Sequence, residues 1–330
     1  MKLGSVLALV AGLTLLGLVI AHSDLGQVAQ RLANLSWTDA LWVMALFTVA
    51  WGAEILAWAL TFTERPARGT WLGHLWLVNM VGEAMNVVMP FGSLGGEPVK
   101  AWLLKRHYAV AYREAAATLV LMQTLLALAE ALFVAVGALL AAALGILPPS
   151  IEHLLSGAAL VLVVLMALAM IGLHQRWLQY SMDAFEHRFG GARYAAIKDS
   201  LTHVEHALAD FARAQPRRFA GSTLLFLVNW IGGAAEVWLL MQLLGAPLPF
   251  AHCWVAEAAV VIIRSLTFFL PAQLGSVEAV TVYVISALGG SADIGLALAA
   301  LRRARELAWS VLGIGVGAAY HLEWRAAARG

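Results

Sequence analysis

Two short segments of the chain place polar residues at the same distances from a proline. Relative to Pro90 and Pro271, polar side chains occur seven and four residues before and a glutamate seven residues after: Glu83, Asn86 and Glu97 in the first segment, and Arg264, Thr267 and Glu278 in the second. Both segments lie inside apolar sequence, and glycine follows each proline (Gly92, Gly95 and Gly96 in the first, Gly275 in the second), so each predicts a helix that is broken near its middle. Broken helices at corresponding positions of two halves indicate the substrate site of a transporter.

Many other charged residues lie inside apolar stretches. Each would cost about 2.5–3.5 kcal/mol at a helix centre that faces lipid, so we expect them to point inward, toward one another or toward a hydrated cavity. Besides the repeated segments, these residues are Glu54, Lys100, Glu130, Glu236, Glu257, Arg302, Arg303, Arg305 and Glu306. Glu54, Glu130 and Glu236 stand singly on apolar stretches, where both interhelical hydrogen bonding and a direct functional role are open interpretations.

The arginines and the helix breaks suit an anionic group such as a lipid phosphate. A guanidinium offers a fork of donors that matches phosphate oxygens, and a helix that begins after each break adds backbone N–H groups and a favourable dipole. Glu97 and Glu278 lie in the first turns of those helices, where helix capping is an alternative role. The candidate substrate-binding residues are Glu83, Asn86, Glu97, Lys100, Arg264, Thr267, Glu278, Arg302, Arg305 and Glu306.

Catalytic and metal-binding interpretations find little support. The segment Gly92–Gly96 lacks the Gly-Lys-Ser/Thr ending of a phosphate loop, and Ser93 has no histidine nearby in the sequence. His203 and His206 are three residues apart, but no further ligands accompany them, which favours a solvated helix face over a metal site. We expect no catalytic residue, no metal, no cofactor and no nucleic-acid partner.

The composition predicts a membrane protein. Of the 330 residues, 62% are hydrophobic and 12% are charged, whereas soluble domains have about 45–50% and about 25%. Stretches long enough to span a bilayer occur at 40–62, 115–145, 154–173, 219–244 and, with internal charges, 291–322. The last is either one continuous helix with arginines at membrane depth or a kinked helix that its arginines anchor at the interface. The segment Leu3–Ala21 is longer than a signal-peptide core and predicts a retained transmembrane helix.

The stretches at 71–104 and 253–289 are too long for one crossing. Each predicts two half-helices that form a re-entrant hairpin, or two closely apposed short spans. If both are hairpins, nearly all basic residues outside the apolar stretches fall on one side, which is then cytoplasmic and holds both termini. That side has Lys2, Arg65, Arg68, Lys105, Arg106, Arg113, the loop 174–218, Arg325 and Arg329, and the other side has Arg31. The hairpins then enter from opposite sides, and the two halves are related by inversion.

The chain is expected to form a single transmembrane domain over residues 1–330. Its repeat-like halves cover approximately 40–145 and 219–322, and the loop 174–218 between them has apolar residues at helical spacing, which predicts cytoplasmic amphipathic helices. The segment 24–34 predicts a further interfacial helix.

The motifs resemble a known family. They are Gly82-Glu83-Ala84-Met85-Asn86, Met89-Pro90, Gly95-Gly96-Glu97-Pro98-Val99-Lys100-Ala101, Phe269-Leu270-Pro271, Gly275, Glu278 and Arg302-Arg303-Ala304-Arg305-Glu306. In this order they resemble the transmembrane flippase-like domain of lysylphosphatidylglycerol synthases, and most closely the stand-alone branch associated with hopanoid biosynthesis. The resemblance covers roughly residues 40–320. The aminoacyl-transferase domain of the full-length synthases would follow the membrane domain, so we expect no lipid lysylation by this chain, which stops at Gly330.

The sequence thus predicts an all-α polytopic protein of the bacterial inner membrane, with two inverted pseudo-repeats that each carry a broken or re-entrant helix pair. The resemblance implies lipid translocation, or supply of a lipid to a membrane-lipid or hopanoid modification pathway. Its partners would be the bilayer, a lipid or lipid-linked substrate and lipid-biosynthetic enzymes. Two alternatives stay open: a non-transporting scaffold of a lipid-biosynthesis complex, which would tolerate loss of the intramembrane charges, and an integral-membrane lipid-modifying enzyme, which would convert its substrate in detergent.

Overall fold

The protein is all-helical throughout the part of the chain that the structure describes. This computed structural model describes residues 13–21, 23–65, 67–88, 95–175, 209–268, 270 and 273–327. Pro90, Pro271, His203 and His206 lie outside these ranges, as do most of the predicted amphipathic loop and the first part of the segment Leu3–Ala21. The predicted short helix at 24–34 is present as α2 (Leu25–Ala33), which begins after an Asp24 cap.

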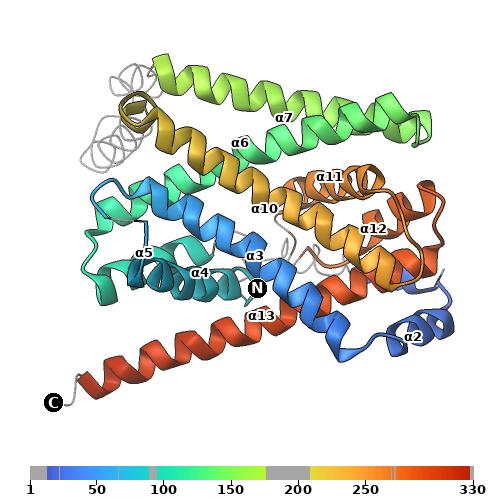
Figure 1. Ribbon diagram of the computed structural model, residues 1–330, viewed down its shortest axis with the longest axis horizontal. Helices are drawn as coiled ribbons and strands as arrows, with labels where there is room; N and C mark the ends of the chain where they lie inside the picture. Colours follow the sequence, from blue (N-terminus) through green and yellow to red (C-terminus); the bar gives the residue numbers. More distant parts are fainter. Residues whose placement is uncertain are drawn as a thin grey trace.

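Long apolar helices form the body of the molecule (Figure 1). They are α3 (Trp37–Thr61), α6 (Tyr112–Leu144), α7 (Pro149–Gln175) and α10 (Pro216–Leu243). Each contains a segment long and apolar enough to cross a membrane, which confirms the spans expected at 40–62, 115–145, 154–173 and 219–244. A fifth long helix, α13 (Ala292–Ala327), carries the charged residues and runs without interruption past residue 322, which agrees with the interpretation of this stretch as one continuous helix.

Local sequence signals set the ends of these helices. At the start of α3, the Ser36 hydroxyl accepts a hydrogen bond from the Asp39 amide (3.2 Å), and the Asp39 carboxylate accepts one from the Ser36 amide (2.8 Å). This reciprocal capping satisfies donors that the first turn leaves without partners. A different signal ends α6: its C-terminal cap is Gly145, whose backbone φ of +57° favours glycine. Each end therefore coincides with a residue type suited to it.

Four shorter helices form two pairs. The first pair is α4 (Thr70–Val88) and α5 (Gly96–Tyr108), and the second is α11 (Phe250–Leu266) and α12 (Ser276–Ala287). Within each pair the two helices pack against each other, and Figure 1 shows the pairs in opposite halves of the molecule. The expectation that both over-long stretches break into two helices is confirmed.

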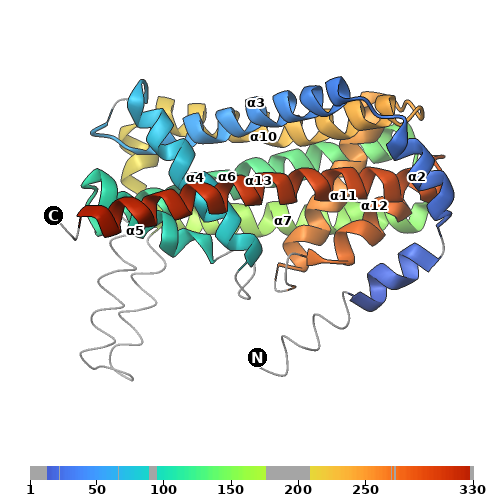
Figure 2. The same cartoon turned by 90° about the horizontal axis from the view of Figure 1, so that it is seen from below.

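The connections between helices gather at two ends of the bundle. In Figures 1 and 2, the α3–α4 and α5–α6 connections lie at the same end as the C-terminus of α7, the N-terminus of α10 and the C-terminus of α13. The α6–α7, α10–α11 and α12–α13 connections lie at the other end, with α2. A salt bridge of 3.8 Å between Arg65 and Glu114 joins the α3–α4 connection to the start of α6. Each helix pair therefore begins and ends at one end of the bundle.

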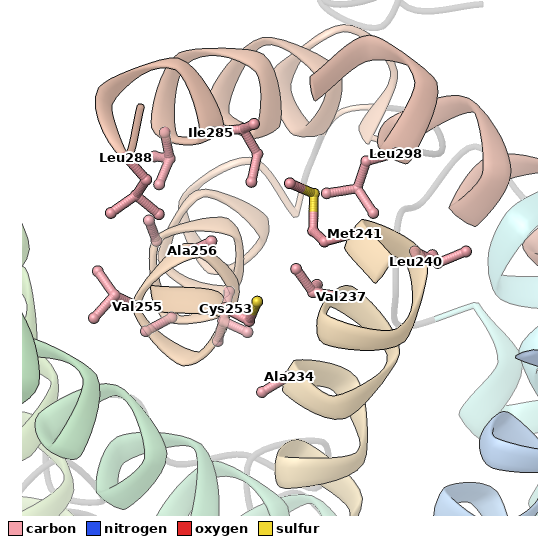
Figure 3. Packing of buried hydrophobic residues seen from close by; sticks show 14 of the residues in the cluster. Ala234, Val237, Leu240, Met241, Cys253, Val255, Ala256, Ile285, Leu288 and Leu298 are labelled. Carbon is pink, nitrogen blue, oxygen red and sulfur yellow. The ribbon is translucent and has the colours of Figure 1, made fainter. Parts of the chain in front are cut away.

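Each pair has its own apolar core. Figure 3 shows one core, in which Val237 of α10 lies beside Cys253 of α11 and Met241 of α10 lies beside Leu298 of α13, with Ile285 of α12 nearby. A second cluster fills the space among α3, α4, α5 and α6 and includes Ile55, Trp58, Leu75, Leu104 and Leu125. The polar residues within the bundle thus lie between or beside two apolar cores.

Glycines allow the closest helix contacts. A Cβ atom on Gly232 of α10 would lie 2.5 Å from the Cβ of Ala50 on α3, and one on Gly313 of α13 would lie 2.4 Å from the Met80 carbonyl oxygen of α4. Because lipid gives helices little hydrophobic reason to associate, membrane helices gain stability from such close backbone approach. The glycines therefore fix where α3 meets α10 and where α13 meets α4.

Candidate functional site

A buried lysine organises the polar residues of the first helix pair. The Lys100 side chain is completely buried, and its ammonium group donates hydrogen bonds to Glu83 (2.7 Å) and Glu97 (2.8 Å). Room for the lysine comes from Gly82, where a Cβ would lie 2.3 Å from the lysine Cε. A buried ammonium group is tolerated when carboxylates pair with it. Lys100 thus ties α5 to α4 inside the first half.

The amide side chain of Asn86 spans the break between α4 and α5. Its oxygen accepts a hydrogen bond from the Gly96 backbone N–H (2.6 Å), and its nitrogen donates to Glu83 (3.1 Å). A Cβ on Gly96 would lie 2.1 Å from the Gly82 carbonyl oxygen, so the two backbones touch at this point. Asn86 therefore satisfies a donor at the start of α5, where the helix leaves its first N–H groups unpaired.

Arginines and glutamates form the corresponding cluster of the second half. Arg264 of α11 donates to one oxygen of Glu306 (2.8 Å), and Arg303 donates to the other (3.0 Å). Arg303 also donates twice to Glu278, at 2.6 and 3.0 Å. The second Glu278 oxygen accepts the Gly275 amide (2.8 Å), so this glutamate both caps α12 and pairs with an arginine.

The contacts of the two helix pairs match in kind. Glu97, near the start of α5, accepts a hydrogen bond from Gln123 (3.0 Å) on the long helix α6 that follows it, and Glu278 of α12 is held in the same way by Arg303 on α13. Asn86 contacts the start of α5 as described above, and the Thr267 hydroxyl lies 3.1 Å from the Ser276 hydroxyl at the start of α12. Two of the three matched positions thus make contacts of a similar kind, whereas Glu83 pairs with Lys100 and Arg264 pairs with Glu306.

A deeper set of charges joins α10, α11 and α13. Arg302 donates to both oxygens of Glu257, at 2.5 and 2.8 Å, and lies 3.4 Å from Glu236. Arg305 pairs with Glu236 through its Nε (2.5 Å), and its guanidinium carbon lies 3.9 Å from the centre of the Phe47 ring. These arginines and glutamates are nearly completely buried. Because each of these four side chains is paired with one of opposite charge, none of them is an isolated charge among apolar side chains.

The three glutamates with two open interpretations all contact other helices. Glu54 accepts hydrogen bonds from Asn79 of α4 (3.0 Å) and Asn229 of α10 (3.1 Å). Glu130 accepts one from Ser265 of α11, and Glu236 pairs with the arginines of α13. These contacts match the interhelical hydrogen-bonding interpretation.

A polar pocket lies where the two helix pairs meet. It has a volume of about 260 Å³ and takes its walls from α3, α4, α11, α12 and α13. Its lining residues are Phe47, Trp51, Glu83, Ala84, Asn86, Val87, Arg264, Gln273, Val277, Arg303, Arg305, Glu306, Trp309 and Ser310. The side of the pocket built by α11 and α13 is rich in arginine, and α4 contributes a carboxylate and an amide.

Half of the ten predicted site residues line this pocket. These are Glu83, Asn86, Arg264, Arg305 and Glu306. The others do not reach its surface: Glu97 and Lys100 lie behind Glu83, Glu278 lies behind Arg303, Thr267 contacts the start of α12, and Arg302 pairs with Glu257. The predicted residues therefore form two layers, one that faces the pocket and one that holds the first in place.

The predicted set missed Arg303 and an aromatic wall. The sequence marks Arg303 as an intramembrane charge, and the structure adds that its side chain lines the pocket. The wall consists of Phe47, Trp51 and Trp309, whose ring centroids lie 5.1–5.5 Å apart. The one signal for it in the sequence is that Trp309 follows Glu306 and Arg305 at helical spacing.

Comparison with known proteins agrees with this architecture. The family model described as the lysylphosphatidylglycerol synthase TM region matches residues 5–315. No curated protein and no solved structure matches the chain. Membership of the hopanoid-associated branch stays a prediction. With a family match over most of its length and several helices able to cross a bilayer, the chain belongs to the lysylphosphatidylglycerol synthase transmembrane-region family, a family of lipid-related multi-pass membrane proteins.

Proposed function

We propose that this protein moves a lipid between the leaflets of a bacterial inner membrane, or supplies a lipid to a membrane-lipid or hopanoid modification pathway, without converting it chemically. The lipid's anionic or polar head group binds in the pocket between the two helix pairs. The observation that carries the proposal is the convergence of Arg264, Arg303 and Arg305 on that pocket. Guanidinium groups bind phosphate oxygens through paired hydrogen bonds, and they do so most strongly where water is scarce.

Arg305 offers the clearest unused donors. Its Nε pairs with Glu236 and its flat face stacks on Phe47, while no hydrogen bond from the described residues engages its two terminal amino groups. Stacking and the Nε contact fix the plane of the guanidinium group. The terminal amino groups can therefore bind an incoming oxygen without a large loss of side-chain freedom.

The directions of the helices support an inverted repeat. In Figure 1, α3 and α10 run in opposite directions, and so do α6 and α13. The α4–α5 pair extends into the bundle from one end and the α11–α12 pair from the other. In transporters built from inverted repeats, the substrate site lies where the repeats meet near the bilayer midplane. The pocket has this position relative to the two pairs.

The distribution of basic residues supports an orientation in which the end with the α3–α4 and α5–α6 connections is cytoplasmic. Arg65 and Arg68 lie in the first of these connections, and Lys105 and Arg106 lie just before the second. Cytoplasmic connections are enriched in such residues. In this orientation the C-terminal end of α13 is cytoplasmic, and the first helix pair enters the bundle from the cytoplasmic side. That the N-terminus is cytoplasmic as well stays a prediction from the sequence.

The test is lipid movement in reconstituted vesicles. The full chain is compared with Arg264→Gln and Arg305→Gln, using fluorescent phosphatidylglycerol whose outer-leaflet fraction is quenched with dithionite. We expect each substitution to slow lipid movement at least about tenfold, which corresponds to loss of one hydrogen bond to a charged group. Arg217→Gln, an exposed arginine at the start of α10, is the matched control and should leave the rate unchanged.

Proper folding of each variant is checked by size-exclusion chromatography and circular dichroism before the assay. If both pocket variants fold normally and move lipid at the parent rate, the head-group role is wrong. Mass spectrometry of the vesicle lipids after the assay shows whether the lipid has been chemically converted. Conversion is the outcome expected of a lipid-modifying enzyme, and an unchanged lipid is the outcome expected of a protein that only moves it.

A further inference from the structure

Glu306 is the acidic residue at the centre of the pocket's arginines. Its two carboxylate oxygens are held by arginines from two helices, Arg264 of α11 at 2.8 Å and Arg303 of α13 at 3.0 Å. The side chain is about 25% exposed and lines the pocket. It therefore occupies the position at which two guanidinium groups converge, and a carboxylate presents to them the same kind of acceptor as a phosphate does.

We infer that Glu306 is a built-in competitor for the lipid head group, which must displace its carboxylate from Arg264 in order to bind. The inference rests on the proposed function, because it concerns the same pocket. It adds a chemical class, since the displacing group must carry phosphate-like oxygens that replace a carboxylate. It also assigns to Glu306 a role in limiting affinity.

The partners of the two arginines differ in a way that makes this exchange feasible. If Glu306 moves away, Arg303 keeps two hydrogen bonds to Glu278, at 2.6 and 3.0 Å. Glu306 is the acidic partner of Arg264 among the described residues. Loss of Glu306 therefore leaves Arg264 as the cation in need of an anion, while Arg303 stays paired. The incoming head group restores the charge balance that the departing carboxylate had provided.

Competition of this kind has a consequence for turnover. Without Glu306, the pocket would present Arg264 with no acidic partner among the described residues, and it would bind a phosphate-bearing lipid tightly and release it slowly. A permeation or transport site has to bind well enough to load and weakly enough to unload. Glu306 returns to the arginines when the lipid leaves, and so it lowers the free-energy cost of release.

The first experiment measures binding of a soluble head-group probe. The detergent-solubilised full chain is titrated with sn-glycerol 3-phosphate by isothermal calorimetry, for the parent protein and for Glu306→Gln, which retains the size of the side chain and removes the competing charge. We expect Glu306→Gln to bind the probe at least about tenfold more tightly, which is the effect of removing one hydrogen bond to a charged group. Glu152→Gln on α7, outside the pocket, removes the same charge and should leave the affinity unchanged.

Two further variants separate competition from a structural role. Glu306→Asp retains the charge but is too short to bridge both arginines, so its affinity for the probe should lie between those of the parent and Glu306→Gln. In the double variant Arg264→Gln/Glu306→Gln the gain in affinity should disappear. In the vesicle assay Glu306→Gln should move lipid more slowly than the parent. Slower movement combined with tighter binding of the probe could not result from a loss of fold, because an unfolded protein would also bind the probe less tightly.

The outcomes distinguish this inference from the proposed function. If the parent binds the probe, Arg264→Gln weakens binding and folded Glu306→Gln binds no more tightly than the parent, the competitor role is overturned while the head-group pocket stands. If no variant binds the probe, and Arg264→Gln and Arg305→Gln move lipid at the parent rate, both proposals fail.

Discussion

Substitution of Arg302 by glutamine should lower the free energy of unfolding by about 3–5 kcal/mol, the range measured when one partner of a buried ion pair is removed. The structure gives the reason. Arg302 is 7% exposed and Glu257 is 3% exposed, and two hydrogen bonds of 2.5 and 2.8 Å join them. Without the arginine, the Glu257 carboxylate stays buried with no cation at contact distance among the described residues. Glu236 is affected less, because Arg305 still contacts it at 2.5 Å.

The same reasoning predicts a rescue. Since most of the cost comes from the uncompensated Glu257 charge, the double variant Arg302→Gln/Glu257→Gln should recover more than half of the lost stability. The two side chains are in direct contact, so their effects should not add, and a double-mutant cycle measures the coupling. Arg217→Gln, an exposed arginine of α10, should change stability by less than about 0.5 kcal/mol.

Unfolding is followed by far-ultraviolet circular dichroism in mixed micelles, with an increasing fraction of denaturing detergent. Five proteins are compared at one protein concentration and one lipid content, because bound lipid stabilises the folded state. They are the parent, Arg302→Gln, Glu257→Gln, the double variant and Arg217→Gln. A loss below about 1 kcal/mol for Arg302→Gln, against the 3–5 kcal/mol expected, would show that the pair is not essential to the bundle. A double variant no more stable than the single one would show that the cost does not arise from Glu257.

Two further predictions concern packing and topology. Gly313→Leu should destabilise the protein by about 1–3 kcal/mol and abolish lipid movement, because a Cβ there would lie 2.4 Å from the Met80 carbonyl oxygen. The control is Gly315→Leu, because a Cβ at Gly315 would meet nothing within 4 Å. Stability is measured by thermal unfolding in detergent. Single cysteines in place of Arg65 and Lys105 should both react with an impermeant maleimide from the cytoplasmic side of inside-out vesicles, and labelling from opposite sides would rule out the hairpin formed by the first helix pair.

The positions of the helices and of their breaks could be predicted from the sequence because membrane physics constrains them strongly. A helix must be about 20 apolar residues long to cross a bilayer, and a proline followed by glycines interrupts it. Hence α3, α6 and α10 lie where their apolar stretches predict, and both over-long stretches form helix pairs. The inward direction of Lys100 follows in the same way, because an ammonium group that faces lipid is costly.

The sequence could not predict which charges would line the pocket. Arg302, Arg303 and Arg305 are close in sequence, but successive residues of a helix point about 100° apart, and each meets a different set of partners. Arg302 lies deepest beside Glu257, Arg303 lies between two glutamates of the pocket region, and Arg305 faces the pocket itself. Assigning these partners requires the rotation of α13 relative to α10, α11 and α12, which depends on contacts between residues far apart in sequence.

The aromatic wall escaped prediction for a different reason. Phe47 and Trp51 lie in an apolar helix that also carries exposed aromatic residues, Trp37 and Trp42, and a buried one, Trp58. Aromatic residues are common at membrane interfaces, so their type alone does not separate a pocket wall from a lipid-facing surface. Only the approach of Trp309 from α13 makes the distinction.

The packing of α13 against both helix pairs makes this helix a mechanical link between the two halves. One part of it contacts α4 through Gly313, and another contacts α12 through Gly295, where a Cβ would lie 2.6 Å from the Val282 Cα. Both contacts are close approaches of backbone to backbone, so we expect α13 to move together with the helices that it touches. The Arg302–Glu306 segment lies between these two contacts along α13. If the two helix pairs shift relative to each other during the proposed lipid movement, this segment would transmit the shift to the arginines of the pocket.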